Sequence, residues 1–431
     1  MAYEYNEEPR SAKRARDDWY RARAKKMAQR RRRILLAAML AVSLLIIGVV
    51  LLRGCRKQPQ VAAPETTAPT TTPTLPPATT PTEPETEITL VFGGDVMVTD
   101  QTVESGNTGN GYDYTEIFQD VAATLAGADG AFVNFEGNLA GAPYGTDSAS
   151  APQAMIQALA NAGVDFIQTA NSCAINNAIS GLRSTIDGIR QAGMEPLGTF
   201  ATEEEREKTR GYTICDIGGI RVALVAFTKG MNGLGLAGHD YSVNLLYKDY
   251  TSSYQQIDES TIRTILKSIQ AQKPDVVIAL LHWGSEYNSI VSTRQENITK
   301  LMLENGVDAI IGTHSHYVQK IQYDRENGTV VAYSLGDLYG NAEKSGTNYS
   351  VLLQLQITRD NLTGQTKITD CQCIPVYLLT PQRDEEAMRV VRLEEAMAQY
   401  ENHHIDCVGD KAYQNMQAAL AKIKSKTGIY E

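Results

Sequence analysis

Short apolar runs, rich in β-branched residues and bounded by polar or turn-forming residues, recur along the chain from residue 88 onward. Runs of this length and composition are typical of buried strands. They lie at 88–92, 131–135, 165–169, 221–227, 275–281, 307–311, 330–334 and 349–357. Segments with the apolar spacing of helices lie between several of them, at 152–162, 181–192, 259–272 and 293–305. This alternation predicts a layered α/β domain with both faces of the sheet covered.

The pattern changes toward the C-terminus. No helical segment separates the runs 330–334 and 349–357, so these two strands could be antiparallel. Beyond Pro375, the segments 384–400 and 409–425 have the spacing of amphipathic helices, which either pack on the domain or are partly free.

The N-terminal part of the chain has a different character. Residues 34–52 carry no charge, and such a run is long enough to cross a hydrocarbon core about 30 Å thick. Four arginines, at 30–33, precede the run, so the positive-inside rule places the N-terminus in the cytoplasm. A cleaved signal peptide, or a lipoprotein signal ending at Cys55, is the alternative. The long charged tail and Arg53 disfavour both alternatives.

Together these features predict a single-pass protein of the cell membrane with its C-terminal domain outside the cell. The predicted parts are a basic cytoplasmic tail (1–33), a transmembrane helix (34–52), a Pro/Thr-rich linker (53–87), a globular domain (88–382) and a C-terminal helical extension (383–431). The linker composition is typical of an extended stalk.

Charge is distributed unevenly along the chain. Residues 1–57 hold 15 Lys/Arg and 5 Asp/Glu, so the remainder holds 25 and 45 of the totals of 40 and 50. The body therefore carries a net charge of −20 behind a basic tail. An acidic body argues against binding nucleic acid, because phosphate contacts need Lys and Arg. The six cysteines have no zinc-like spacing, and outside the cell Cys215 could form a disulfide with Cys371 or Cys373.

Polar side chains follow many of the predicted strands. The sequences at these strand ends are GGDVM (93–97), NFEGN (134–138), TANSC (169–173), HWGSE (282–286), GTHSH (312–316) and YSLGD (333–337). Ligands and metals bind at the carboxyl edge of α/β sheets. Carboxylate, amide and imidazole groups gathered there suit a divalent metal that activates water. Two imidazoles at alternate positions, His314 and His316, would point the same way, at one metal or at one metal and the substrate.

Each of these residues also has an ordinary structural explanation. An Asp or Asn after a strand is usually a turn or cap residue, as Asp95, Asn134 and Asn171 could be. His282, beside Trp283, could be a hydrogen-bonded histidine of the core. The recurrence of such residues at several strand ends favours a site over these separate explanations.

The motifs resemble those of the CapA family, the poly-gamma-glutamate capsule proteins, whose fold is that of calcineurin-like metallophosphoesterases. The matching motifs are GGDVM (93–97), NFEGNL (134–139), HWGSEY (282–287), GTHSHYVQ (312–319) and YSLGD (333–337). The resemblance implies metal ligands at Asp95, Glu136, His282, His314 and His316. It implies catalytic positions at Glu136, Cys173, His282 and His316, and supporting groups at Asn134, Asn171, Glu286 and Asp337. Manganese, zinc or iron is the implied cofactor.

The chain departs from this family pattern at several positions. Family members have Asn and His where this chain has Ser172 and Cys173, and related phosphoesterases use that Asn as a metal ligand and that His as a proton donor. Thr313 and Ser315 also replace a His and a Pro, and Asp337 replaces an Asn. A hydroxyl is a weaker ligand than an amide oxygen, and a buried thiol resists ionisation. We therefore expect a one-metal or attenuated site, held by Asp95 and the three histidines.

Three functions follow from this resemblance. The first is a surface-anchored protein of capsule or cell-envelope polymer biosynthesis, acting as a metal-dependent hydrolase or transferase on an anionic polymer. The second is a non-catalytic subunit that binds the polymer or a membrane synthase complex. The third is an active phosphoesterase, which would lack the usual catalytic His.

Overall fold

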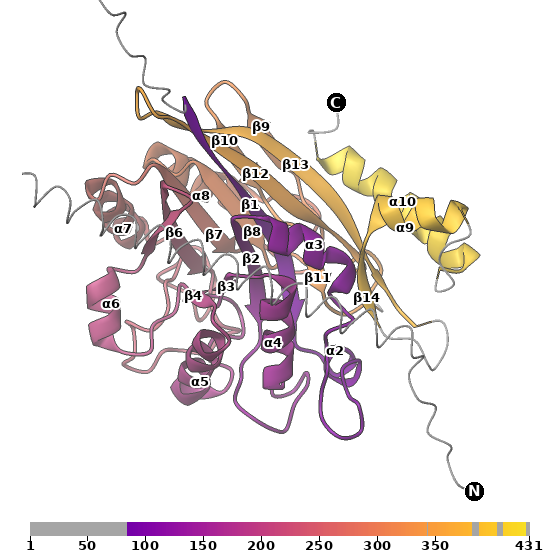
Figure 1. Cartoon of the computed structure of the whole chain (residues 1–431). Helices are drawn as coiled ribbons and strands as arrows, with labels where there is room; N and C mark the ends of the chain where they lie inside the picture. The colour runs from indigo at the N-terminus through magenta and orange to yellow at the C-terminus, as the bar shows by residue number, and fades with distance from the viewer. Residues whose placement is uncertain (1–83, 343, 382–387, 403–407, 428–431) are drawn as a thin grey trace, which may run out of the picture. The chain divides into compact units, whose positions relative to one another are not determined.

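Two stacked mixed β-sheets form the centre of the described chain. The structure is a computed structural model, and it describes residues 84–342, 344–381, 388–402 and 408–427. Side chains from both sheets meet in one core, among them Leu90 and Phe92 from the larger sheet and Leu224 and Ile278 from the smaller. Helices lie on the outer faces, so the layers are helix, sheet, sheet and helix (Figure 1).

The larger sheet combines a parallel half with an antiparallel half. Its strands are β1 (Glu85–Met97), β2 (Gly130–Glu136), β3 (Phe166–Gln168), β4 (Glu195–Leu197), β11 (Asp337–Tyr339), β12 (Tyr349–Asp360), β13 (Thr366–Leu379) and β14 (Arg389–Arg392). Their order is β14-β13-β12-β1-β2-β3-β4, with β11 also paired to β1. The strands β1 to β4 are parallel, whereas β12, β13 and β14 pair antiparallel.

The smaller sheet is parallel at its centre. Its strands are β5 (Thr213–Ile217), β6 (Ile220–Thr228), β7 (Val276–His282), β8 (Ala309–Thr313), β9 (Ile321–Asp324) and β10 (Thr329–Ala332). Their order is β5-β6-β7-β8-β10-β9, and β6, β7, β8 and β10 run parallel. Successive side chains of a strand point to opposite faces. In β6, Val222 and Leu224 therefore face the core between the sheets, whereas Ala223 and Val225 face the outer helices.

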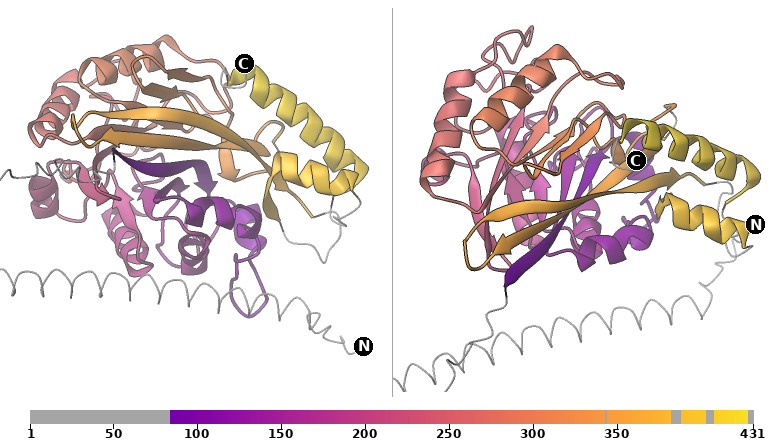
Figure 2. Two further views of the ribbon diagram at one scale, coloured as in Figure 1. Left: turned by 45° about the horizontal axis from the view of Figure 1, so that its top comes forward. Right: turned by 90° about the horizontal axis from the view of Figure 1, so that it is seen from above.

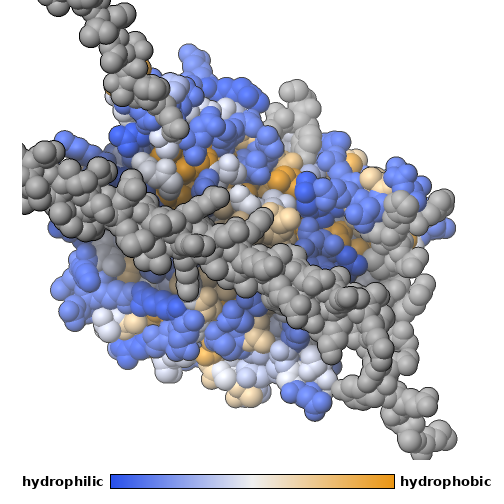
Figure 3. Space-filling view, in the orientation of Figure 1, coloured by the Kyte–Doolittle hydropathy of each residue, from blue (hydrophilic) through white to orange (hydrophobic). Residues whose placement is uncertain are grey.

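Helices cover both outer faces. Their bounds are α2 (Asp100–Glu104), α3 (Gln119–Gly127), α4 (Gln153–Ala162), α5 (Ala178–Gln191), α6 (Glu203–Thr209), α7 (Glu259–Ala271), α8 (Thr293–Glu304), α9 (Leu393–Glu401) and α10 (Asp410–Lys426). Apolar residues of α3 and α4 pack on the larger sheet, and those of α7 and α8 pack on the smaller sheet (Figure 2). Figure 3 shows hydrophilic residues over most of the visible described surface, with hydrophobic ones scattered among them. The apolar residues that define the pattern in the sequence are thus mainly internal.

The layered α/β architecture predicted from the apolar pattern is confirmed. Every predicted strand and each of the four predicted interior helices is present, with shifts of a few residues at the ends. The strands over 330–334 and 349–357 are not neighbours, because β10 belongs to the smaller sheet and β12 pairs antiparallel with β1 in the larger one. The two strands have no helix between them because the chain crosses from one sheet to the other through β11.

The C-terminal segments pack on the domain. Apolar side chains of α9 and α10, including Leu393, Met416 and Ile423, join the core that lies between the sheets. The prediction of a helix over 384–400 is wrong at its start, because Arg389–Arg392 forms β14 and extends the larger sheet. Its two valines face opposite sides of the sheet, with Val390 packed toward the outer helices and Val391 toward the core between the sheets, as successive residues of a strand do.

The predicted tail, transmembrane helix and most of the linker lie outside the described residues. Within those residues, none of the helices has the length and apolar character that a membrane span requires. The thiols of Cys215 and Cys371 are not bridged, so the disulfide that the sequence allowed between them does not form in the structure.

Glycine at position 312 is required by close packing at the end of β8. A Cβ atom there would lie 2.0 Å from the carbonyl oxygen of Tyr333 and 2.5 Å from Nε1 of Trp283. Those two groups are hydrogen-bonded at 2.9 Å, with the indole N–H as donor. We therefore expect Gly312→Ala to lower the free energy of unfolding by about 1–3 kcal/mol, the usual cost of overpacking.

Urea unfolding measures this effect. Gly127→Ala is the control, because its added methyl meets nothing within 4 Å at the end of α3. Equal stability of the two variants would contradict the packing argument.

Candidate functional site

The carboxyl ends of parallel strands from both sheets meet at one place. Asp95 lies in β1 and Glu136 ends β2, while His282 ends β7 and His314 follows β8. A bulge at Gly93 and Gly94 shifts the register of β1 against β2 and brings Asp95 beside Asn134. Strand β11 then adds Asp337 directly opposite Asp95.

These residues form two buried groups of three. The first group contains Asp95, His316 and Asp337, and the second contains Glu136, His282 and His314. In each group, the potential ligand atoms all lie within 4.8 Å of one another. All six side chains are at most 5% exposed. We call them the aspartate triad and the glutamate triad.

Short contacts hold the aspartate triad together. His316 Nδ1 lies 2.9 Å from Asp337 Oδ1 and 3.7 Å from Asp95 Oδ2. The backbone N–H of His314 donates to Asp95 Oδ2 at 3.0 Å, and Asn134 donates its amide N–H to Asp95 Oδ1 at 2.6 Å. Hydrogen bonds to both of its oxygens therefore hold the Asp95 carboxylate in one orientation.

Ser172 lies inside the glutamate triad. Its hydroxyl is 2.9 Å from His282 Nε2 and 3.4 Å from His314 Nδ1, and His282 Nε2 is 3.4 Å from Glu136 Oε1. On the far side of His282, Nδ1 lies 3.1 Å from the Thr313 hydroxyl. Ser172 thus uses the imidazole nitrogens that a metal ion would need.

The backbone sends His314 and His316 to different triads. Both have positive φ angles, 88° and 58°, which are uncommon for residues other than glycine. The centres of their imidazole rings are 6.1 Å apart. The prediction that they point the same way is wrong, because it assumed an extended strand and β8 ends at Thr313. Backbone strain of this kind tends to occur at functional sites. The structure divides Asp95 and the three histidines between the two triads, and the expectation of a one-metal or attenuated site stays a prediction.

Burial and neighbouring charges shift the pKa values of the site. Burial raises the pKa of Asp95 well above its ordinary value, and the charge of Glu136 raises it further. Burial lowers the pKa of His314 well below its ordinary value, with His282 and Lys229 adding to the effect, so His314 is a neutral imidazole. Burial opposes a charge on His316 too, but Asp337, Glu136 and Asp95 outweigh it and raise its pKa to about 10.

The triads have the donor set of a divalent metal centre. Each contains a buried carboxylate oxygen, Glu136 Oε2 or Asp337 Oδ2, that has no hydrogen-bond partner among the described residues. A buried polar atom without a hydrogen-bond partner lowers the stability of the fold. The three carboxylates of the two triads also repel one another. A cation in each triad would relieve both costs. Carboxylate and imidazole together suit manganese, zinc or iron.

The other predicted site residues surround these triads. Asn171 donates to Asn134 Oδ1 at 3.1 Å and, through its Oδ1, accepts the backbone N–H of Cys173 at 3.0 Å. Burial raises the pKa of the Cys173 thiol well above its ordinary value, and the charges of Glu136, Glu286 and Asp95 add to this. Cys173 is therefore a neutral thiol rather than a nucleophilic thiolate. The structure brings the predicted residues together, and their catalytic roles stay a prediction.

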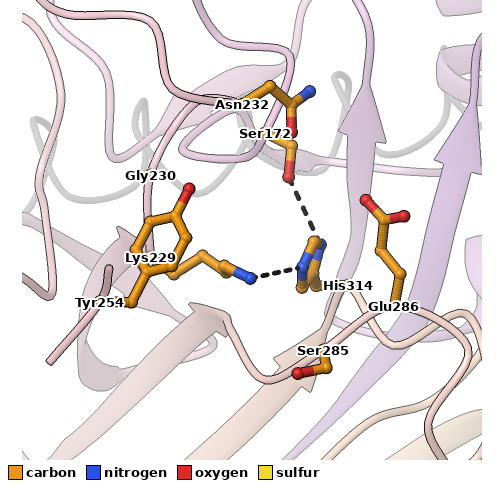
Figure 4. Close-up of a pocket in the computed structure, with 8 residues that line it drawn as sticks. All are labelled: Ser172, Lys229, Gly230, Asn232, Tyr254, Ser285, Glu286 and His314. Atoms are coloured by element: carbon orange, nitrogen blue, oxygen red, sulfur yellow. Dashed lines mark hydrogen bonds between the residues drawn. The ribbon is translucent and has the colours of Figure 1, made fainter. Parts of the chain in front are cut away.

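A pocket of about 230 Å³ opens beside His314. It is lined by Ser172, Lys229, Gly230, Asn232, Tyr254, Ser285, Glu286 and His314. Figure 4 shows Lys229 reaching His314 from one side, with Glu286 on the other. The Lys229 ammonium donates to His314 Nε2 at 3.3 Å and to the carbonyl oxygen of Gly284 at 3.0 Å.

Sequence reasoning missed Lys229. The signal that could have found it was its position, two residues after the apolar run 221–227, at the same sheet edge as the other candidates. A lysine is not one of the carboxylate, amide and imidazole groups that bind a divalent metal, so its residue type gave no signal. Burial lowers the pKa of Lys229, against the charges of Glu286 and Glu136.

Comparison with solved structures finds phosphoesterases and phosphatases at low similarity. A calcineurin-like phosphoesterase, YfkN from Bacillus subtilis, is 14% identical with a TM-score of 0.41, covering 81% of this chain and 100% of that one. A novel phosphatase from Mycoplasma pneumoniae is 13% identical with a TM-score of 0.41, and the match covers 68% of this chain and 94% of that one. Likeness at these scores carries no argument about this chain's fold or chemistry.

Two curated relatives match more of the sequence. The capsule biosynthesis protein CapA of Bacillus anthracis is 26% identical over 288 residues, covering 64% of this chain and 66% of that protein. The PGA biosynthesis protein CapA of Bacillus subtilis (strain 168) is 25% identical over 226 residues, which cover 52% of this chain and 54% of that protein. The chain thus spans between about half and two thirds of the length of these relatives.

The family described as bacterial capsule synthesis protein PGA_cap matches residues 89–342, more than half of the chain. The match includes both triads, the Lys229 pocket and all the motifs on which the resemblance was recognised. The resemblance to the CapA family is confirmed, and the chain belongs to this family of bacterial capsule synthesis proteins.

Proposed function

We propose that this chain is a membrane-anchored, extracellular protein of capsule or cell-envelope polymer biosynthesis. In this proposal it acts as a metal-dependent hydrolase or transferase on an amide or ester bond of an anionic polymer such as poly-gamma-glutamate. The observation that carries the proposal is the pair of buried triads, each with one carboxylate oxygen lacking a hydrogen-bond partner among the described residues. We further propose that the domain is related to the calcineurin-like phosphoesterases.

Each triad would hold one metal ion, and neighbouring residues would orient the ligands and admit the substrate. Asp95, His316 and Asp337 would hold one divalent ion, and Glu136, His282 and His314 the other. Bound ions would lower the pKa of water and polarise a carbonyl or phosphoryl oxygen. Asn134 would keep the Asp95 carboxylate oriented through its 2.6 Å hydrogen bond, as groups beside metal ligands commonly do. The pocket beside His314 would admit the substrate, since it is the opening next to the glutamate triad.

Membrane anchoring belongs to the proposal as well. The uncharged run 34–52 behind four arginines supports it, and an extended linker would then hold the domain away from the membrane. Synthase subunits in the membrane would be the natural partners of such an anchor. Metal positions would also offset the repulsion between an acidic domain and an anionic polymer.

A non-catalytic role is the second candidate. The observation that favours it is the neutral Cys173 thiol at the position where a proton donor would be needed. A polymer-binding or scaffold subunit of a synthase complex would need no such donor.

Polymer cleavage distinguishes the two candidates. We expect the full-length protein, loaded separately with manganese, zinc and iron, to shorten or transfer poly-gamma-glutamate chains, as followed by size-exclusion chromatography. We expect His282→Ala to lose at least about 100-fold of this activity. His239→Ala is the matched control, because His239 contacts Tyr241 and lies outside both triads. Polymer that binds but keeps its length in all three metals would favour the scaffold.

A further inference from the structure

The pocket beside His314 has a cation on one side. Lys229 follows β6, and its ammonium group lies 4.6 Å from the centre of the Tyr254 ring. Gly230 makes room for this arrangement, because a Cβ there would lie 2.4 Å from the Tyr250 carbonyl oxygen and 2.8 Å from the Tyr254 ring. The loop is therefore shaped so that Tyr254 lies against the lysine.

Lys229 retains hydrogen-bonding capacity. An ammonium group has three N–H donors, and Lys229 uses two of them, on the Gly284 carbonyl oxygen and on His314 Nε2. Among the described residues, Lys229 makes no ion pair with a carboxylate within 4.0 Å, although Glu286 lines the same pocket. A half-buried cation that has only neutral partners attracts an anion strongly, because screening by water is reduced.

The rest of the domain makes this cation unusual. The body carries a net charge of −20, and the Glu136 carboxylate belongs to the same triad as His314, which lines the pocket. A surface of that charge would repel an anionic ligand from most directions. Lys229 is placed where an approaching anion would meet positive charge next to the triads.

We propose that Lys229 forms a subsite for an anionic group of the substrate, either a carboxylate or a phosphate. This would be the substrate's anionic group next to the bond that reacts at the triads. Asn232 and Ser285, on the pocket wall, would supply further polar contacts. Glu286, on the other side of His314, limits the affinity for simple anions and favours ligands that also carry an N–H or O–H donor. The inference rests on the proposed function only in assuming that this pocket takes the substrate.

Binding to the metal-free protein tests the subsite without requiring catalysis. The probes are γ-linked triglutamate, which carries carboxylates, and glycerol 1-phosphate, which carries a phosphate, each titrated calorimetrically into chelator-treated full-length protein. We expect at least one probe to bind, and Lys229→Met to weaken it at least about tenfold, as for a lost charge-assisted hydrogen bond. Which probe binds identifies the anionic group.

Two further variants make the test specific. Lys248→Met removes the same charge from an exposed position in the same region outside the pocket, and should change the affinity less than about twofold. Glu286→Gln removes a negative charge from the pocket wall and should strengthen binding. This gain does not depend on the stability of the Lys229 variant.

The subsite is overturned if neither probe binds, if Lys229→Met binds as the wild type does, or if Lys248→Met loses as much. These outcomes are separable from failure of the proposed function. Lys229-dependent binding without polymer cleavage leaves the subsite standing, whereas cleavage with unchanged binding by Lys229→Met leaves only the proposed function.

Discussion

The full-length protein should bind up to two equivalents of divalent metal, one in each triad, and lose both when the two triads are disabled together. The variants are Asp337→Asn and Glu136→Gln, which keep the size of each side chain but remove the charge of the carboxylate that holds a partnerless buried oxygen. Each single variant should lose one equivalent. The double variant should retain none.

The two equivalents should differ in affinity. The glutamate triad already has the Ser172 hydroxyl among its imidazoles, at 2.9 Å from His282 Nε2. The Lys229 ammonium, 3.3 Å from His314 Nε2, also places a positive charge beside that triad. Both effects lower the affinity of the glutamate triad for a cation. We therefore expect a metal ion to bind the aspartate triad first, and Asp337→Asn to remove the more tightly bound ion.

Elemental analysis after dialysis against manganese, zinc or iron measures the stoichiometry, and thermal unfolding gives an independent readout. An ion present at 100 times its dissociation constant should stabilise the wild type by about 2.7 kcal/mol, a gain that the double variant should not show. Asp249→Asn is the control, since this carboxylate lies in a loop outside both triads and caps local backbone N–H groups. Metal retained by the double variant would remove the basis of the proposed chemistry.

Restoring Asn and His at positions 172 and 173 should raise hydrolysis by about 10²–10⁴-fold, the usual contribution of general acid catalysis. Cys173 has a raised pKa because burial and the charges of Glu136, Glu286 and Asp95 all oppose a thiolate. The same negative charges would favour a protonated imidazole at that position. An Asn at 172 would replace the serine hydroxyl within the glutamate triad by an amide oxygen, a stronger ligand.

The measurement is the rate of hydrolysis of an ester or phosphoester substrate by the metal-loaded Ser172→Asn/Cys173→His protein. Cys173→Ser should show no gain, because a hydroxyl is no better a proton donor than the thiol. Adding His282→Ala to the double variant should remove the gain if it depends on the glutamate triad. Absence of any gain in a protein that binds metal would indicate that the site serves binding.

The apolar pattern predicted the framework of the fold because it depends on local rules. In β6, alternate residues face the inner core and the outer helices, so both faces are buried and the strand is a continuous apolar run in the sequence. Parallel strands also end at a common edge, so Asp95, Glu136 and His282 could be predicted to gather before their partners were known. The family resemblance extended this to the remaining positions.

The pairing of β12 and the strand β14 could not be predicted in this way. An apolar run such as 349–357 specifies that it will be buried but not which sheet will bury it, because either sheet offers the same kind of surface. The segment 389–392 is too short for periodicity to separate strand from helix, and it became a strand only because β13 presents an edge to pair with.

The sequence by itself determined the fold class, the family and the set of residues at the strand ends, because period, composition and motif spacing are carried along the chain. Only the tertiary structure decided how those residues divide. Positive φ angles send His314 and His316 to different triads, β11 brings Asp337 opposite Asp95, and the end of β6 brings Lys229 to His314. Distances between side chains from separate strands depend on register, bulges and backbone angles across two sheets, and no local pattern in the sequence specifies these.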